Sequence, residues 1–161
     1  MSVAEDFKEA LSCWASGVSV VTTNADGMLY GLTVSSFSSL SLDPPLILVC
    51  VANTNRLPAM AEQAGAFAVS ILARGQERAS NYFAKSGRLP TPDFVEIEGQ
   101  WTARDQAVVK DALAHLVCEL HHALPEGDHT ILVGRVVHAE CHASREPLLY
   151  YRRGYRTVSD R

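Results

Sequence analysis

Residues 30–53, which read YGLTVSSFSSLSLDPPLILVCVAN, decide the fold of this chain. An apolar run ends in a group of hydroxyl side chains, crosses Pro44 and Pro45, and re-enters a fully apolar strand. Small hydroxyl donors at strand ends can hold an oxygen-rich ligand, and the apolar strands beside them can cover a flat ring. We therefore expect a buried binding site here. The hydroxyl side chains, which we expect at a turn, are Thr33, Ser35, Ser36, Ser38, Ser39 and Ser41.

The composition is that of an ordinary globular chain. Its 161 residues are 47% hydrophobic and 20% charged, which predicts one domain with a core of its own. A net charge of −4 argues against a nucleic-acid surface, because phosphate binding needs clustered Lys and Arg. No apolar run approaches the length of a membrane span, so we expect no membrane partner.

Cysteine usage indicates a reducing compartment. The four cysteines are widely spaced, form no CxxC pair and follow no signal peptide. Two of them, Cys50 and Cys118, lie in apolar runs, where cysteine behaves as a small hydrophobic residue. We therefore expect a cytoplasmic protein with every thiol reduced. The other two thiols belong to Cys13 and Cys141.

The segment that precedes the first strand has helical periodicity. Residues 4–17 place Phe7, Leu11 and Trp14 at helical spacing, and Gly17 suits a C-terminal stop. We expect a helix that ends close to this glycine.

The middle of the chain alternates short strands and helices. Residues 17–36 predict a hairpin with its turn at residues 24–27 (NADG), and Asn53 to Arg56 predict a polar turn after the apolar strand. The other expected elements are a strand over 46–52, a helix over 57–64, a strand over 66–72, a helix over 75–86, and a long surface loop over 87–106 that Trp101 pins to the core.

The C-terminal third is expected to be mostly strand. Residues 108–124 fit either a helix or a strand buried on both sides, but the β-branched run 131–141 needs a neighbour across the loop at 124–130. Residues 147–159 predict a closing strand or hairpin. Strands joined by tight turns favour a mainly β fold with a few helices, arranged as an antiparallel barrel.

Two polar turns are candidates for ligand binding. The serine group lacks a GxSxG elbow, so a nucleophile is excluded, but a binding rim and an ordinary surface loop both remain open. The Asn53–Arg56 turn opens a helix, where backbone N–H groups and a nearby arginine can seat a phosphate. Its alternative is a plain helix cap with a solvated arginine.

The C-terminal half carries six histidines, at positions 115, 121, 122, 129, 138 and 142, but no framework of metal-ligand spacing. On strands these residues would point to different faces, so we expect no metal site. His129 stands apart because it follows Gly127-Asp128 in a loop. Residues 150–156 (YYRRGYR) either clasp an anionic aromatic ligand or form an edge strand with outward arginines.

The order of these motifs resembles the short-chain flavin reductases of two-component flavin-dependent monooxygenases. The serine block and the Gly127-Asp128-His129 sequence are its most specific elements. The similar segments are FKEALSCWASGVSVVTT, GLTVSSFSSLSLDPPLILVCVA, AFAVSIL followed by QERASNYFA, ALAHLVCEL, GDHTILVGRV and PLLYYRRGYR.

The resemblance implies a fold, an activity and partners. The fold would be an antiparallel, Greek-key-like, FMN-binding split β-barrel, with residues 1–161 forming a single flavin reductase-like domain. The activity would be hydride transfer from NADH or NADPH to FMN or FAD. The reduced flavin would then diffuse to a partner oxygenase, and the reductase would be a homodimer.

The resemblance also implies site residues. His129 would face the nicotinamide side of the flavin ring, as a positioning group. Tyr155 would help to close that pocket, and Phe83 would contact the flavin if the ligand is FAD. The remaining flavin contacts would be Gly31, Leu32, Thr33, Val34, Ser35, Ser36, Cys50, Val51, Ala52, Asn53, Asn55 and Arg56.

Two other functions stay open from the sequence. A non-catalytic flavin-binding or flavin-carrier protein could use the same barrel, because a fold does not fix a function. An oxidase of the pyridoxamine-phosphate type would need a basic phosphate site, which the hydroxyl-rich turn suits poorly.

Overall fold

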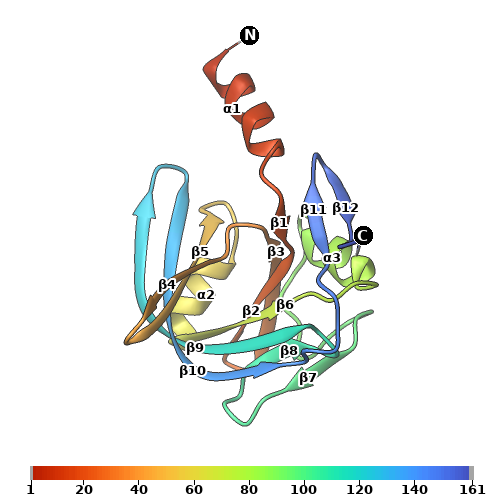
Figure 1. Ribbon diagram of the computed structural model, residues 1–161. Helices are drawn as coiled ribbons and strands as arrows, with labels where there is room; N and C mark the ends of the chain where they lie inside the picture. The colour runs from red at the N-terminus through yellow and green to blue at the C-terminus, as the bar shows by residue number, and fades with distance from the viewer. Residues whose placement is uncertain (1, 160–161) are drawn as a thin grey trace.

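The computed structural model describes residues 2–159 and is built around one seven-stranded antiparallel sheet (Figure 1). The strand order in this sheet is β3-β2-β6-β9-β10-β5-β4, and the smaller sheets have the orders β1-β11-β12 and β7-β8. The expectation of a mainly β, antiparallel fold with a few helices is confirmed. The strands are β1 (Ser16–Gly17), β2 (Ser19–Ala25), β3 (Met28–Val34), β4 (Ser38–Leu42), β5 (Pro45–Ala52), β6 (Ala66–Ile71), β7 (Gly99–Trp101), β8 (Ala107–Val109), β9 (Ala114–Glu126), β10 (His129–Cys141), β11 (Leu149–Tyr151) and β12 (Gly154–Arg156).

The predicted hairpin between β2 and β3 is confirmed. Its two turn residues, Asp26 and Gly27, have φ values of 51° and 76°. A two-residue turn with both residues in the left-handed region matches the right-handed twist of the strands that it joins. The Asp-Gly pair therefore fixes the pairing in which Ser19 lies opposite Val34.

Part of the hydroxyl group forms a strand, where the sequence predicted a turn. Residues 38–42 form β4, which pairs with β5 across a tight connection that includes the cis peptide bond Asp43–Pro44. The turn prediction was therefore wrong for Ser38, Ser39 and Ser41, and also for Thr33, which lies inside β3. Alternation of serine with leucine is a strand pattern with one polar face, and this local pattern prevails over the turn propensity of serine.

The curled sheet brings the loop after β3 against β5. The Ser36 hydroxyl donates to the Cys50 carbonyl oxygen at 2.8 Å and accepts from the Cys50 N–H at 3.0 Å. One side chain thus satisfies both backbone groups of a residue in β5. This contact joins β3 and β5, which are far apart in the strand order of the sheet.

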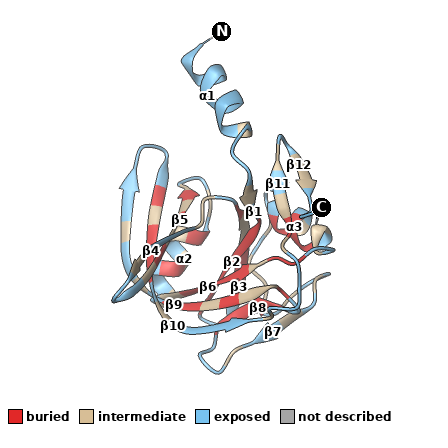
Figure 2. Cartoon of the chain, viewed as in Figure 1, coloured by how far each residue is buried: buried red, intermediate tan, exposed pale blue. Residues whose placement is uncertain are grey.

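The core of the described residues consists of two large apolar clusters and a smaller third one, and its buried residues are red in Figure 2. The first packs α2 against the sheet through Leu57, Phe67 and Leu132, which are fully buried. The second lies under α3 and contains Phe83 and Leu148. No helix among residues 2–159 is long and apolar enough to cross a membrane.

Within the described part of the chain, three helices accompany the sheet: α1 (Val3–Ser12), α2 (Leu57–Ala64) and α3 (Glu77–Ala84). The predictions for α2 and α3 are confirmed, with α3 slightly shorter than expected. The first helix ends at Ser12, five residues before the expected glycine. It has no buried residue and projects away from the rest of the molecule (Figures 1 and 2).

The segment 87–106 is mostly loop, as expected, but it ends in β7. Trp101 is 39% exposed, so the prediction that it pins the loop to the core was wrong. Phe94 and Ile97 pack against the α3 cluster in its place. A Cβ atom on Gly99 would lie 1.8 Å from the Phe94 ring, so this close approach requires glycine.

The ambiguous run 108–124 is confirmed as mostly strand. It forms β8 and most of β9, with a short turn between them, and β9 pairs with β10 around a turn at Gly127–Asp128. The pairing slips between Val133 and Gly134 and again between Val136 and His138. Such bulges bend the strands locally and allow the long hairpin to curl with the sheet.

Candidate functional site

A cavity of about 240 Å³ lies where β3 ends. One wall comes from the end of β3, a second from α3, and a third from the β11–β12 hairpin. Hydroxyl and amide groups alternate with aromatic and aliphatic side chains around it, as in pockets that hold small molecules. Its lining consists of Val18, Thr33, Val34, Ser35, Ser80, Asn81, Ala84, Tyr150 and Tyr155.

Hydrogen bonds hold the walls of this cavity together. The Thr33 hydroxyl donates to the Ser80 carbonyl oxygen at 2.7 Å, which ties β3 to α3. The Tyr155 hydroxyl lies 2.8 Å from Ser80 Oγ and 2.7 Å from Asn81 Oδ1, which ties β12 to the same helix. These polar groups are therefore fixed in position before any ligand enters.

A second cavity, of about 460 Å³, continues from the first and shares Ser35 and Tyr150 with it. Three cationic side chains line it: Lys8 from α1, and Arg152 and Arg153 from the turn between β11 and β12. Among residues 2–159, Arg153 is the only one of these three cations with a salt-bridge partner, Glu9 at 3.5 Å. A hydroxyl-rich pocket that opens onto cations suits a ligand that carries both a flat ring and an anionic group.

The structure brings together only part of the predicted set. Thr33, Val34, Ser35 and Tyr155 share the first cavity, and Ser36 lies in the second. Ser36 also uses its hydroxyl to hold β5, as described above.

The predicted residues of β5 lie behind Ser36 and outside both cavities. Val51 is 1% exposed and belongs to the α2 cluster, while Cys50 and Ala52 are half-buried. Cys50 contacts the loop after β3 through its backbone, where Ser36 bonds to it.

The polar turn after β5 acts mainly as a connector. Asn53 Oδ1 accepts from the Thr130 hydroxyl at 2.7 Å, and Asn55 Oδ1 accepts from the Leu57 N–H at 3.0 Å. The Arg56 side chain makes no capping bond and lines a separate depression beside Met60. The Asn55 side chain thus caps the first residue of α2, which agrees with the interpretation of this turn as a helix cap.

His129 begins β10, opposite Ala52. Its Nδ1 lies 2.6 Å from Asp128 Oδ1, and its side chain is 47% exposed. This hydrogen bond lowers the pKa of Asp128 below its ordinary value. With the proton on Nδ1, the lone pair of Nε2 is free to accept a hydrogen bond from a ligand. In Figure 1, the turn before β10 and the β11–β12 hairpin stand on opposite sides of α1.

The remaining predicted residues form the support behind the cavity. Gly31 and Leu32 precede Thr33 on β3, and Phe83 packs directly against Gly31. Phe83 is 3% exposed and sits under the Arg88 guanidinium, 5.1 Å from the ring centroid. Phe83 therefore belongs to the core of this chain.

Several lining residues were missed from the sequence. Ser80 and Asn81 follow each other inside a helical pattern, so nothing marked them as ligand-facing. Lys8 lies on a helix whose position relative to the sheet no periodicity reveals. Arg152 and Arg153 belong to the aromatic and cationic segment that was weighed as a clasp, and their placement beside the cavity favours that interpretation.

The fold and the two adjoining cavities define a mainly β domain with a hydroxyl-lined pocket beside cationic side chains. Residues 11–159 match the family described as the flavin reductase like domain. The chain belongs to this family, as its motifs indicated.

Named relatives and solved structures agree with this assignment. The chain is 45% identical over 154 residues to the reductase component of 4-hydroxyphenylacetate 3-monooxygenase from Thermus thermophilus, and the match covers 96% of each. A structure of the Streptomyces globisporus C-1027 NADH:FAD oxidoreductase SgcE6, in complex with NAD and FAD fragments, superposes with a TM-score of 0.90 at 30% identity, covering 98% of this chain and 93% of the other. BorF, the flavin reductase component of a bacterial two-component tryptophan halogenase, superposes with a TM-score of 0.88 at 36% identity, covering 98% and 99%.

Proposed function

We propose that this protein is an NAD(P)H-dependent flavin reductase that transfers a hydride from NADH or NADPH to FMN or FAD. The observation that carries the proposal is the hydroxyl-lined cavity at the end of β3, which opens onto cations in a chain of the flavin reductase like family. Relatives named as NADH-dependent FMN and FAD reductases support the choice of cofactors. We also propose that the chain is a single domain with the split-barrel fold.

The cavity suits a flavin in both size and chemistry. Val18, Val34 and the ring of Tyr150 offer apolar surface to a flat ring. Thr33 and Ser35 stand where a ring edge or a ribityl chain needs hydrogen bonds. We place the phosphate toward Lys8, Arg152 and Arg153, because these cations line the same cavity as Ser35 and Ser36.

The chemistry needs no protein nucleophile. A bound flavin supplies the two-electron redox step. The residues of the chain bind and orient the two nucleotides, exclude water, and donate hydrogen bonds to the negative charge that develops on the ring. We assign His129 to the nicotinamide side, where its free Nε2 can position the donor.

The other predicted contacts remain part of the proposal. We expect Gly31 and Leu32 to contribute through the backbone of β3, and the end of β5 to contribute through the segment 50–53. We expect Asn55 and Arg56 to contact the ligand only if it extends past the polar turn that follows β5. Phe83 would act through its packing under β3, since its ring is buried.

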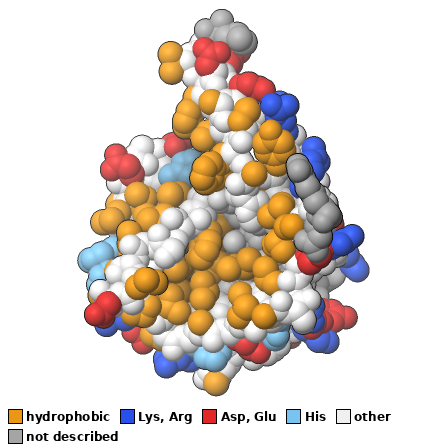
Figure 3. All heavy atoms as spheres, in the orientation of Figure 1, with side chains coloured by type: hydrophobic (Ala, Val, Ile, Leu, Met, Phe, Trp, Pro, Cys, Tyr) orange, Lys and Arg blue, Asp and Glu red, His pale blue; other side chains and the backbone are white. Residues whose placement is uncertain are grey.

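We also propose that the protein is a homodimer. The face of α1 that carries Phe7 and Leu11, with Trp14 just beyond, is more than half exposed at each of these residues. Figure 3 shows hydrophobic side chains along α1 and over the face of the molecule below it. A second copy of the chain would cover this apolar surface, which is costly to leave in water. Because α1 also supplies Lys8, the partner would lie beside the site.

The dimer is tested by light scattering during size-exclusion chromatography. Leu11→Glu places a charge on the apolar face and should give a monomer. Leu89→Glu is the matched control, because it adds the same charge at an exposed leucine outside α1. A monomeric wild-type protein, or a dimer that survives Leu11→Glu, contradicts the assigned face.

We also propose a partner protein and a cellular compartment. We propose that reduced flavin diffuses to a partner monooxygenase, as the names of the relatives from two-component systems suggest. We propose a cytoplasmic location, because all four cysteines are free.

The decisive experiment follows NADH and NADPH oxidation under anaerobic conditions with no flavin, with FMN and with FAD. A reductase oxidises the nicotinamide only when flavin is present and reduces one flavin for each nicotinamide consumed. Tight flavin binding without turnover would establish the carrier alternative instead.

His129→Ala tests the assigned side of the ring. We expect the KM for the nicotinamide to rise while the flavin dissociation constant stays within about twofold. His122→Ala, which changes an exposed histidine on β9, is the control and should alter neither constant. An equal loss in both constants for His129→Ala would refute this placement.

A further inference from the structure

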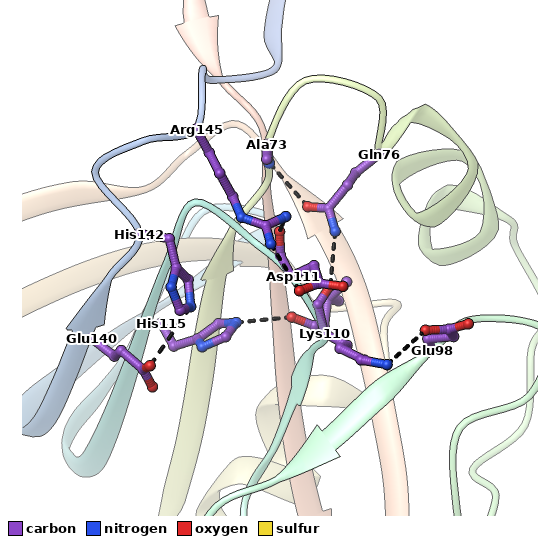
Figure 4. Close-up of polar contacts among 10 residues, drawn as sticks. Ala73, Gln76, Glu98, Lys110, Asp111, His115, Glu140, His142 and Arg145 are labelled. Atoms are coloured by element: carbon purple, nitrogen blue, oxygen red, sulfur yellow. Dashed lines mark hydrogen bonds and ion pairs between the residues drawn. The ribbon is translucent and has the colours of Figure 1, made fainter.

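A group of metal-ligating side chains lies at the end of the β9–β10 pair that is remote from its turn. His115 on β9 is the direct cross-strand partner of Glu140 on β10, and His142 follows two residues later. One ligand atom from each residue lies within 4.8 Å of the other two. Figure 4 shows the three side chains converging from two strands and the segment after β10.

The expectation that these histidines point to different faces was wrong for this group. The two bulges in the hairpin shift the register in opposite directions, so the pairing beyond them returns to that set by the turn. His115 and Glu140 consequently face each other, and His142, one residue past the end of β10, has the same parity as Glu140. Ligand atoms from the start of β9 and from the end of β10 therefore come together.

The hydrogen bond of His115 prepares the ring for a metal. Its Nε2 lies 2.8 Å from the Val109 carbonyl oxygen, which can only accept, so Nε2 carries the proton. The lone pair of Nδ1 is then free. Metal-bound histidines typically donate their second ring N–H to a backbone carbonyl in this way, which fixes the tautomer and the ring orientation. Burial lowers the pKa of His115, in keeping with a neutral ring.

The other two ligands are held close together but stay accessible. His142 Nε2 lies 3.7 Å from Glu140 Oε1, and the two side chains are 35% and 47% exposed. The His142 backbone N–H donates to the Leu113 carbonyl oxygen at 2.8 Å, which anchors the segment to the start of β9. The nearby Arg145 bonds to Asp111 at 2.8 Å, so it is engaged away from Glu140.

The spacing fits a small tetrahedral ion. Ligands about 2.0–2.1 Å from a tetrahedral zinc ion stand roughly 3.4 Å apart. The His142–Glu140 separation of 3.7 Å is already close to this value, and rotation of these partly exposed side chains can close the rest. A cavity of about 220 Å³ that His115 and Glu140 help to line gives room for a water molecule as the fourth ligand.

We propose that His115, Glu140 and His142 bind a divalent transition-metal ion of borderline softness, with Zn²⁺ as the representative ion. Two imidazoles and one carboxylate suit such ions, whereas Mg²⁺ and Ca²⁺ require oxygen ligands. None of the three residues lines the cavities at the end of β3. The ion would therefore act on stability, by clamping the open end of the β9–β10 pair.

The test uses tag-free, full-length protein stripped of metal with a chelator. Isothermal titration with ZnCl₂ measures affinity and stoichiometry, and thermal melts with ZnCl₂ or MgCl₂ measure stabilisation. The test variants are His142→Ala and Glu140→Gln, because both side chains are partly exposed and their loss leaves the core intact. His122→Ala is the matched control, since it removes an exposed histidine from the same pair of strands.

We expect one zinc ion per chain and a higher melting temperature with zinc but not with magnesium. We expect at least a tenfold loss of affinity in both test variants, because losing only an outer-shell partner of a metal ligand already costs this much. A Co²⁺ derivative should show no thiolate charge-transfer band. Equal zinc binding by wild type and His142→Ala would overturn the proposal. Loss of binding in His122→Ala, or a thiolate band that implicates the neighbouring Cys141, would overturn it as well.

Discussion

Thr33 on β3 donates a hydrogen bond from Oγ1 to the Ser80 carbonyl oxygen on α3, at 2.7 Å. Because this bond uses the only proton of the hydroxyl, Oγ1 can offer a ligand only its lone pairs. The strand that leads into the serine loop and the helix across the cavity are thereby held at a fixed separation. Thr33 and Ser80 therefore line the cavity and, through this hydrogen bond, also hold its two walls together.

Thr33→Val should weaken both the fold and the flavin site. Valine keeps the shape of threonine but removes the bond to Ser80, so the free energy of unfolding should fall by about 1 kcal/mol. Flavin affinity should fall about fivefold or more, because Oγ1 no longer accepts from the ligand. Urea unfolding and flavin fluorescence quenching measure the two effects. Thr33→Ser, which keeps the hydroxyl, should recover most of the affinity; a serine variant as weak as the valine variant would contradict the role of Oγ1.

The hydrogen bond between Asp128 and His129 should be visible in the titration of the carboxyl group. The bond from His129 lowers the pKa of Asp128, so the pair stabilises the folded chain above the ordinary aspartate range and loses this contribution as the pH falls through the lowered pKa. His129→Ala should raise the pKa of Asp128 toward its ordinary value. Carboxyl-carbon NMR measures the midpoint, and His122→Ala should leave it unchanged. The same midpoint with and without His129 would show that the bond does not form in solution.

Local sequence chemistry predicted the elements that depend on neighbours in the chain. The Asp26-Gly27 pair set the β2–β3 turn, and the Gly127-Asp128 pair set the β9–β10 turn. The second turn also implied that His115 lies opposite Glu140, since counting residues outward from it gives that pairing. The spacing of the histidines alone does not show this pairing, because Glu140 is one of its two members.

The remaining features depend on contacts that no local pattern encodes. Ser80 and Asn81 face the cavity only because Thr33 and Tyr155 hold α3 against it. Trp101 lies at the surface because a different aromatic residue, Phe94, fills the place that the sequence assigned to it. Which of two aromatic residues in a loop packs into the core depends on the shape of the space that the whole fold leaves for it.

The thiol of Cys118 should be inert in the folded protein. Burial between β6 and β10 raises its pKa to about 12, and the reactive species is the thiolate. Its alkylation should therefore be slower than that of an ordinary thiol by roughly a thousandfold, the factor that three pKa units give, and exposed Cys141 serves as the internal comparison. Mass spectrometry of peptides alkylated before and after unfolding measures the ratio. Similar rates at the two cysteines in the folded protein would show that β9 opens locally.

Gly31→Ala should strain the contact behind the cavity. A Cβ atom at this position would lie 2.8 Å from Phe83 Cε1 and 3.0 Å from Thr22 Cγ2, and Phe83 is buried. Overpacking of this kind costs about 1–3 kcal/mol. Gly17→Ala is the control, because nothing lies within 4 Å of its Cβ position, and the variant should be nearly neutral in urea unfolding.

A second substitution shows whether the strain in Gly31→Ala comes from the Phe83 ring. Phe83→Leu alone should destabilise the protein, since it leaves space in the α3 cluster. Combined with Gly31→Ala, the smaller side chain gives room to the new methyl group, so the double variant should be more stable than the two losses added together, by about 1 kcal/mol. Strictly additive losses would mean that β3 moves away from α3 instead of pressing on Phe83. In that case flavin affinity should fall in Gly31→Ala, because Thr33 would move with the strand.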